Sequence, residues 1–507
     1  NNYTHLELMP LTEFPFDGSW GYQATGYFSI TSRYGEPKGL MKFINACHKA
    51  GIGVIMDFVP AHYVKDGHGL YKFDGGFVYD YPDINRRYTE WDSVYFDVGR
   101  EEVRSFLMSS VGFLAEYFHI DGIRYDAVSN LIYWKGNKEA GVNDGALEFM
   151  KRMNNHMKGY YPGVMLIAED SSDFNGVTKA PDIGGLGFDY KWSGGWTKDL
   201  LEYLSKDPIE RKNYHDQLTV SLLYAYCEHY ILTLGTRDVG ALKDFAEKLP
   251  GTEAQKSAQI REAYAYMMLL PGDDAQKMSQ IRAAYSYTML HPGCKMMAPD
   301  KDMPKELEVF VKDLNNMYLA HPALYQLDDE YDGFEWVQLM KYEENVIAFM
   351  RKTEKPEETI LAVCNFAAIP YENYQVGVPF AGKYKEIFNS DDKKYGGNGV
   401  VNTRVKAAKK DECDEREYSI TLKLPALGVA VFTCTPEETE KKPAAEHSQI
   451  KKSITKTRTV RKAAGKTKVA VKTAVKPVTK KVTKEAPQIV NKTEEKIPVK
   501  KDLTEKK

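Results

Sequence analysis

The chain has 507 residues, enough for two or three domains at about 100–200 residues each. Its formal net charge of −3 is uneven, because the segment from Glu440 to Lys507 has 21 basic and 7 acidic residues and carries about +14, which leaves about −17 for the preceding 439 residues. An acidic body excludes a general nucleic-acid binder, and the lack of any run of 18 apolar residues excludes a membrane-spanning helix. The 12% of aromatic residues, with 34 Tyr, suit a large core and a carbohydrate-stacking surface equally well.

Six cysteines are scattered along the chain without a CxxC pair or a metal-type spacing. No secretory signal is visible. This pattern is typical of a reducing compartment, so we expect a cytoplasmic protein without disulfides. We also expect neither a metal ion nor an organic cofactor.

Short apolar runs alternate with amphipathic stretches through the first half of the chain. Strand–helix alternation predicts an α/β fold with a parallel sheet, here a (β/α)₈ TIM barrel. The predicted strands cover residues 3–10, 51–59, 122–128 and 164–170. Helical spacing of apolar residues appears between them at 37–50 and 100–118.

Carboxylates follow three of these predicted strands, namely Asp57, Asp126 and Glu169. In a parallel barrel the carboxyl ends of the strands form the face where active sites are built. Arg124 and Asp126, two residues apart on a strand, are expected to point to the same side, where the guanidinium can hold the carboxylate ionised. A structural salt bridge explains that pair alone equally well, but not three carboxylates at equivalent places.

The pattern changes after residue 330, and we predict three regions. Residues 1–330 form the barrel, residues 331–436 an antiparallel β-sandwich built from runs such as 345–352, 359–366 and 418–424, and residues 437–507 a disordered Lys-rich tail. A 21-residue repeat begins at Pro250 and again at Pro271. Two copies are too few for a solenoid, so we interpret them as a duplicated helix or a sequence-assembly error.

Several motifs, read together, resemble bacterial glycogen branching enzymes, the 1,4-α-glucan 6-glycosyltransferases of the α-amylase clan. The resemblance rests on "DGSWGYQATGY" (17–27), "DFVPAH" (57–62), "GIRYDA" (122–127), "IAED" (167–170) and "GLGFDYKWSGGW" (185–196). It extends over about 430 of the 507 residues. It implies a soluble transferase that acts on α-glucans such as glycogen and amylose, without a specific nucleic-acid partner.

The resemblance also implies a role for each site residue. Asp126 is expected to be the nucleophile and Glu169 the general acid/base, which must start the cycle protonated; the charge of Asp170 beside it would favour that state. A retaining double displacement of this kind uses two carboxyl groups about 5–5.5 Å apart. Substrate-binding roles fall to Tyr22, Asp57, His62 and Arg124.

The chain departs from the family pattern in three places. The module and the first barrel strand that precede residue 3 in the family are missing, so we expect an N-terminally truncated barrel in a fragment of a longer product. At the third catalytic carboxylate the chain has "ILTLGTRDVG" (231–240), where Thr236 and Arg237 replace a His-Asp pair unless one inserted residue makes Asp238 the transition-state stabiliser. The loop after residue 297 is also shorter by about twenty residues.

Several alternatives remain open from the sequence. His62 in isolation is more often a structural histidine, and only its motif favours substrate binding. Trp20 and Trp196 fit a sugar platform and a core position equally well. The main functional hypothesis is glucan branching, the runner-up is a catalytically impaired α-glucan-binding homologue, and an amylase-type hydrolase comes third, because carboxylates alone do not separate a transferase from a hydrolase.

Overall fold

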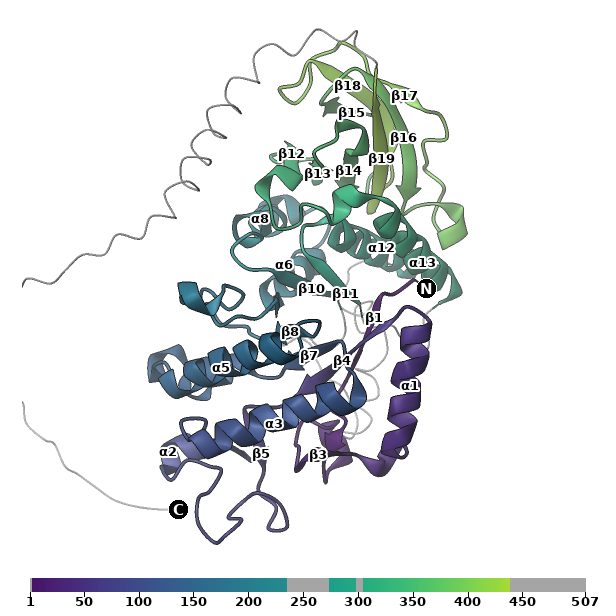
Figure 1. Ribbon diagram of the computed structural model, residues 1–507. Coiled ribbons are helices and arrows are strands. Elements are labelled where there is room, and N and C mark those ends of the chain that lie inside the picture. The colour runs from purple at the N-terminus through teal and green to yellow at the C-terminus, as the bar shows by residue number, and fades with distance from the viewer. Residues whose placement is uncertain (1, 235–272, 298–303, 438–507) are drawn as a thin grey trace, which may run out of the picture. The chain divides into compact units, whose positions relative to one another are not determined.

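A computed structural model describes residues 2–234, 273–297 and 304–437 (Figure 1). Its first region is built on one parallel sheet of seven strands. The order in the sheet follows the order in the chain, with every neighbouring pair parallel. The strands are β1 (His5–Leu8), β4 (Gly53–Phe58), β7 (Gly122–Tyr125), β8 (Met165–Ala168), β9 (Tyr190–Trp192), β10 (Tyr230–Leu234) and β11 (Cys294–Met297).

All four predicted strands of the first half are confirmed, although each is shorter than predicted. β1, β4, β7 and β8 lie inside the predicted ranges 3–10, 51–59, 122–128 and 164–170. The sheet order starts at β1 and ends at β11, as expected for a barrel lacking its first strand. Small paired strands accompany the sheet: β2 (Thr12–Glu13), β3 (Gly26–Ile30), β5 (His62–Val64) and β6 (Ser93–Tyr95).

Helices α1 (Pro37–Lys49) and α3 (Glu101–Phe118) confirm the two predicted helices. Proline at the first position of α1 lacks the N–H that a first turn leaves unpaired, so it suits this start. Figure 1 shows α1, α3 and α5 beside the strands of the sheet. The remaining helices of this region are α2 (Ile84–Arg87), α4 (Val128–Ile132), α5 (Asp144–Tyr160), α6 (Gly194–Ser205), α7 (Asp216–Thr219), α8 (Ser221–Tyr224), α12 (Asp274–Leu290) and α13 (Lys305–Ala320).

The second copy of the 21-residue repeat forms α12. Asp273 caps this helix by accepting from the backbone N–H of Gln276, while the Gln276 side chain accepts from the Asp273 N–H. Such a reciprocal capping box satisfies two backbone donors and starts the helix at a defined residue. The first copy lies outside the described residues.

The strands predicted after residue 330 are also confirmed, and they form two antiparallel sheets. A six-stranded sheet has the order β12-β13-β14-β19-β16-β17, and β15 pairs with β18 in a second sheet. The bounds are β12 (Phe334–Gln338), β13 (Val346–Arg351), β14 (Ile360–Asn365), β15 (Tyr371–Val378), β16 (Gly382–Asn389), β17 (Lys406–Ala407), β18 (Tyr418–Leu424) and β19 (Gly428–Pro436).

Strand alternation gives the six-stranded sheet two apolar faces. Val346 and Ala348 of β13 pack in the core shared with β15 and β18, which makes the sandwich. Ile347 and Phe349 point the other way, into a second core that includes residues of α6, α12 and α13. The predicted tail, 437–507, lies outside the described residues apart from Glu437.

Candidate active site

The three predicted carboxylates lie at the same edge of the parallel sheet. Asp57 is the penultimate residue of β4, Asp126 follows the last residue of β7, and Glu169 follows the last residue of β8. The sheet register aligns Asp57 with Arg124, and Arg124 with Ile167. The carboxyl ends of three neighbouring strands therefore bring these side chains together, as the sequence predicts.

Arg124 is the centre of this carboxylate cluster. Its Nη1 lies 3.0 Å from Oδ2 of Asp57 and 3.1 Å from Oδ1 of Asp126, while its Nη2 lies 2.9 Å from Oε2 of Glu169. The Arg124 side chain is only 4% exposed. One buried guanidinium thus holds three carboxylates in one plane of donors, which fixes their oxygens more narrowly than lysine would.

Asp126 is harder to ionise than an ordinary aspartate. Burial raises the pKa of the Asp126 carboxyl well above its usual range; the charges of Glu169 and Asp57 add to the rise, while Arg124 opposes it. The net direction is opposite to the one expected from the Arg124–Asp126 pair alone, because a single cation is shared among several anions. Asp126 and Glu169 consequently titrate as a coupled pair that retains a proton more strongly than two isolated carboxyls.

Glu169 is the more accessible member of that pair. Its side chain is 38% exposed, against 14% for Asp126. Oε2 of Glu169 also accepts a hydrogen bond of 2.9 Å from the backbone N–H of Ala127, whose φ of 53° is left-handed. This tight turn after Asp126 aims a donor at Glu169, so the end of one strand orients the carboxylate of the next.

Asp57 is enclosed, with 1% of its side chain exposed, and its Oδ2 accepts a hydrogen bond from the hydroxyl of Tyr22. The ring centroid of Tyr22 lies 5.8 Å from Cζ of Arg124. The structure therefore brings Tyr22, predicted from the "SWGYQ" motif, into the same cluster as Asp57, Arg124, Asp126 and Glu169.

His62 lies in the strand β5 just beyond β4 and is 3% exposed. Its Nδ1 is 3.0 Å from the hydroxyl of Ser93, and its ring lies 5.0 Å from the ring of Trp91. Burial lowers the pKa of His62 to about 4. The imidazole is therefore neutral near pH 7 and offers a hydrogen bond rather than a charge.

Two cluster residues were missed by sequence reasoning, Glu7 and Trp192. Glu7 of β1 places Oε1 4.0 Å from Nε of Arg124, which adds a fourth carboxylate. The ring of Trp192 of β9 lies 4.1 Å from Cζ of Arg124. The signal for Glu7 was its place between two leucines in a predicted strand, where an acid is unexpected; β9 is only three residues long and gave no periodic signal.

Three other predictions have definite structural outcomes. Trp196 is a core residue, 1% exposed, with its ring against Tyr287 and His291. Trp20 is 39% exposed, which leaves its face available to solvent. Asp170 does not act as an uncompensated neighbour of Glu169, because Nζ of Lys191 lies 2.8 Å from its Oδ2.

The disputed third carboxylate is not described. β10 is described to its last residue, Leu234, and Thr236, Arg237 and Asp238 lie outside the described residues. Asp238 as a transition-state stabiliser therefore stays a prediction.

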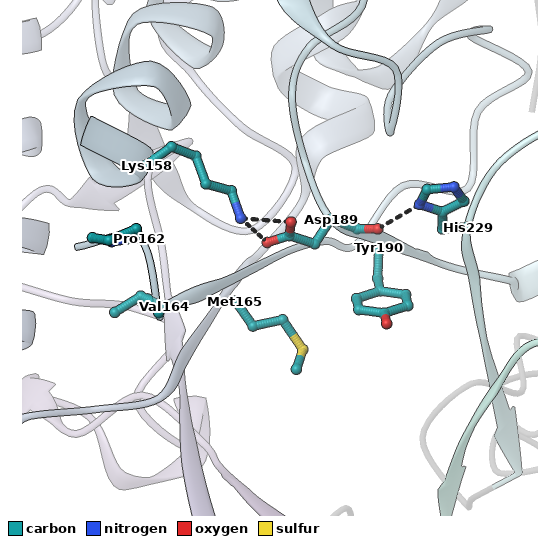
Figure 2. A pocket seen from close by; sticks show the side chains of 8 residues that line it. Lys158, Pro162, Val164, Met165, Asp189, Tyr190 and His229 are labelled. Carbon is teal, nitrogen blue, oxygen red and sulfur yellow. Dashed lines mark hydrogen bonds and ion pairs between the residues drawn. The ribbon is translucent and has the colours of Figure 1, made fainter. Parts of the chain in front are cut away.

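A separate hollow of about 320 Å³ lies at the opposite, amino-terminal ends of β8 and β9 (Figure 2). Met165 and Tyr190, the first residues of these strands, line it together with His229 and the ion pair of Lys158 with Asp189. None of the clustered carboxylates reaches it, so this hollow is not the candidate active site.

Within residues 2–234, 273–297 and 304–437, no set of three or more His, Cys, Asp or Glu residues has an arrangement suited to a metal ion. All six cysteines have free thiols. In the described part of the chain no helix is both long and apolar enough to span a membrane.

Two family profiles match the chain. Residues 4–73 match the α-amylase catalytic domain, and residues 336–435 match the α-amylase C-terminal all-beta domain. Among solved structures, the chain resembles an α-amylase from Geobacillus thermoleovorans complexed with acarbose, at a TM-score of 0.60 and 15% identity over 86% of this chain and 89% of that one. It also resembles a Nostoc punctiforme debranching enzyme, at a TM-score of 0.55 and 14% identity over 85% of each chain. These similarities establish the α-amylase fold.

Curated relatives give a much closer match. The chain is 42% identical over 434 residues to the 1,4-alpha-glucan branching enzyme GlgB of Geobacillus stearothermophilus, which covers 85% of this chain and 68% of that protein. It is 40% identical over 442 residues to the enzyme of the same name from Bacillus subtilis, covering 87% and 70%. The one from Fusobacterium nucleatum is 43% identical over 434 residues, covering 85% and 70%. The chain thus spans about two thirds of the length of these relatives.

Proposed function

The chain belongs to the family of 1,4-alpha-glucan branching enzymes, and on this premise we propose that its carboxylate cluster carries out a retaining transglycosylation on α-glucans. The single observation that carries the proposal is the sharing of one buried guanidinium by Asp126 and Glu169, at 3.1 and 2.9 Å. This arrangement presents two carboxyl groups of different exposure at the carboxyl edge of the sheet. Two such groups are what a double displacement at a sugar carbon requires.

In the first step, an Asp126 oxygen attacks the anomeric carbon of an α-1,4-linked glucose. The bond from that carbon to the bridging oxygen breaks, and Glu169 transfers its proton to that oxygen as the shortened glucan leaves. The required starting state has the proton of the coupled pair on Glu169. The greater exposure of Glu169 suits a group that must reach the leaving oxygen.

In the second step, Glu169 takes the proton from the 6-hydroxyl of an acceptor glucan while the hydroxyl oxygen attacks the same anomeric carbon. The bond to Asp126 breaks, its carboxylate is released, and the transferred segment is now joined by an α-1,6 bond. Two inversions give overall retention at the anomeric carbon.

The other predicted residues bind and orient the reacting sugar. Asp57 and Tyr22, joined by a hydrogen bond, are assigned to the hydroxyls and the face of the sugar next to Asp126. His62, neutral and backed by Ser93, is assigned as a hydrogen-bond partner of the same sugar. Arg124 preserves the geometry of the carboxylates and limits the repulsion between them.

The proposal extends to the organisation of the chain. We assign residues 1–330 to the catalytic barrel, 331–436 to a C-terminal β-sandwich and 437–507 to a basic tail. The substrates are α-glucans such as glycogen and amylose, as the relatives' name implies. Six free thiols suit a reducing compartment, so we place the protein in the cytoplasm.

An assay on amylose tests the proposal. The chain is incubated with amylose, and three quantities are followed: the iodine-stained absorbance, the reducing ends, and the NMR signals of α-1,6 anomeric protons. Branching lowers the absorbance and raises the α-1,6 signals without new reducing ends. New reducing ends indicate a hydrolase, and no change in any quantity indicates a glucan binder; either result contradicts the proposal.

A further inference from the structure

The indole of Trp192 lies against the guanidinium of Arg124. Cζ of Arg124 is 4.1 Å from the ring centroid, well within the range of a cation–π contact. Trp192 is 8% exposed and Arg124 is 4% exposed, so little water competes for this contact. Trp192 follows no carboxylate and touches none of the assigned sugar-binding residues in the contacts described above.

The position of this guanidinium decides the geometry of the whole cluster. Nη1 serves Asp57 and Asp126 while Nη2 serves Glu169, so a rotation about the Nε–Cζ axis or a sideways shift alters all three contacts together. Hydrogen bonds to carboxylates on the rim do not prevent a displacement out of the guanidinium plane. A flat aromatic ring against one face does.

Trp192 is itself firmly held. Inside the sheet it packs with Ile55, Ile167 and Ile231 in a small apolar cluster. Its neighbour Lys191 points to the opposite face, where Nζ lies 2.8 Å from Asp170 and 2.9 Å from the carbonyl of Ser172. The short strand β9 is therefore fixed on both faces, and the indole has little freedom to move away from Arg124.

We propose that Trp192 is a positioning residue for the transglycosylation, acting as the seat that keeps the Arg124 guanidinium in register with Asp57, Asp126 and Glu169. This inference rests on the proposed function. It assigns Trp192 no contact with substrate, only control of the group that orders the reacting carboxylates.

The charged groups that face Arg124 make the consequence of losing this seat predictable. Glu7, Asp57, Asp126 and Glu169 surround the guanidinium, and the Tyr22 ring lies 5.8 Å from Cζ. If Arg124 is free to lean towards any of these acids, Asp126 loses part of the attraction that offsets its burial and its acidic neighbours. Asp126 then keeps its proton to higher pH.

Two substitutions at Trp192 and one control test the proposal. Trp192→Leu removes the flat face, whereas Trp192→Phe keeps a smaller one. Trp196→Leu is the matched control, because Trp196 is an equally buried tryptophan that packs on Tyr287 and His291 instead of Arg124. In the full chain, Trp192→Leu is expected to lower kcat by about 10- to 100-fold with KM changed less than about twofold, the scale of a small misplacement of catalytic groups. Trp192→Phe is expected to recover most of the loss, and Trp196→Leu to lower Tm while leaving kcat of the folded enzyme unchanged.

A readout independent of turnover separates this inference from the proposed function. The carboxyl ¹³C signal of Asp126, assigned by its loss in Asp126→Asn, is titrated in the three variants and the parent. The midpoint is expected at higher pH in Trp192→Leu and unchanged in Trp196→Leu. If the midpoint moves but amylose is not branched, the proposed function fails and the seat stands. An unmoved midpoint, or an equal fall in kcat in Trp192→Leu and Trp196→Leu, overturns the inference.

Discussion

Two buried arginines of this protein are solvated in opposite ways. Arg124 lies among acids, and although burial lowers its pKa, the charges of Asp57, Glu169 and Asp126 outweigh burial and raise it well above the usual range. Arg211, which is fully buried near the C-terminal sheet, donates instead to the backbone carbonyls of Leu204, Lys206 and Phe366 at 2.7, 3.1 and 2.9 Å. Burial lowers the pKa of Arg211 to about 10.

The difference separates a structural arginine from one in a reactive cluster. Carbonyl groups carry no charge and do not titrate, so Arg211 joins segments that are 155 residues apart without affecting any acid. Arg124 serves more carboxylates than one positive charge can neutralise. The surplus negative charge makes protonation of the cluster costly to avoid, which is a property of catalytic sites more than of structural ion pairs.

The largest effect is expected from Asp126→Asn, which removes the proposed nucleophile. Activity on amylose should fall by more than about 1,000-fold, because the amide cannot form the covalent intermediate. Stability should not fall. Burial and like charges raise the pKa of Asp126, so ionising it opposes folding once the pH exceeds the value of the unfolded chain, and this cost grows until the folded group has ionised.

Calorimetry over a range of pH checks that second half. The Tm of Asp126→Asn should equal or exceed that of the parent at neutral pH, and the gain should shrink as the pH falls towards 4. A neutral-pH Tm several degrees below the parent would mean that Asp126 is a structural partner of Arg124, and the contrast with Arg211 would disappear.

Glu169→Gln is expected to have the next largest effect. Loss of a general acid should lower turnover of amylose by about 100- to 10,000-fold, with glucan affinity preserved because the amide is nearly isosteric. Glucosyl donors with leaving groups that need no protonation should still form the covalent intermediate, which mass spectrometry detects on Asp126. Normal turnover of amylose by this variant would assign proton transfer to another group.

Arg211→Met tests the other side of the comparison. It should lower the free energy of unfolding by about 2 kcal/mol, since three buried carbonyls lose their donor while the burial of a charge is relieved. The measurement is urea unfolding at pH 7. Amylose turnover by the folded variant should stay within about twofold of the parent, and a much larger loss would show that Arg211 also supports the reactive cluster.

The sequence predicted much of the barrel and most of the cluster for a physical reason. Apolar strands followed by an acid have a clear local pattern, and parallel strands bring their carboxyl ends to one edge, so Asp57, Asp126 and Glu169 converge whatever the details of packing. Arg124 was accessible because it shares a strand face with Asp126.

Residues that act across the fold were not accessible in this way. Trp192 stands on a three-residue strand without a readable period, and its contact with Arg124 depends on the register of two further strands. The direction of the Asp126 shift also required the count of acids around one guanidinium. That count includes Glu7, which the sequence places 119 residues before Asp126 with no local link between them.

The smallest expected effect concerns His62, a buried titratable group with a neutral environment. Burial lowers its pKa to about 4, whereas a histidine of the unfolded chain titrates near about 6.5. Below pH 6.5 the unfolded chain therefore binds a proton that the folded protein does not, so stability falls as the pH drops from 6.5 towards 4. At pH 5 the part of this loss due to His62 should be about 2 kcal/mol. His62→Gln keeps a hydrogen-bonding side chain but cannot titrate, so the difference in unfolding free energy between pH 7 and pH 5 should be smaller than in the parent by about that amount. Urea unfolding at the two pH values measures it, with His48→Gln as a control because His48 is partly exposed and paired with Asp121. An equal pH dependence in the parent and His62→Gln would show that His62 is protonated in the folded state, and it would then act as a cation beside the carboxylates instead of a neutral hydrogen-bond partner.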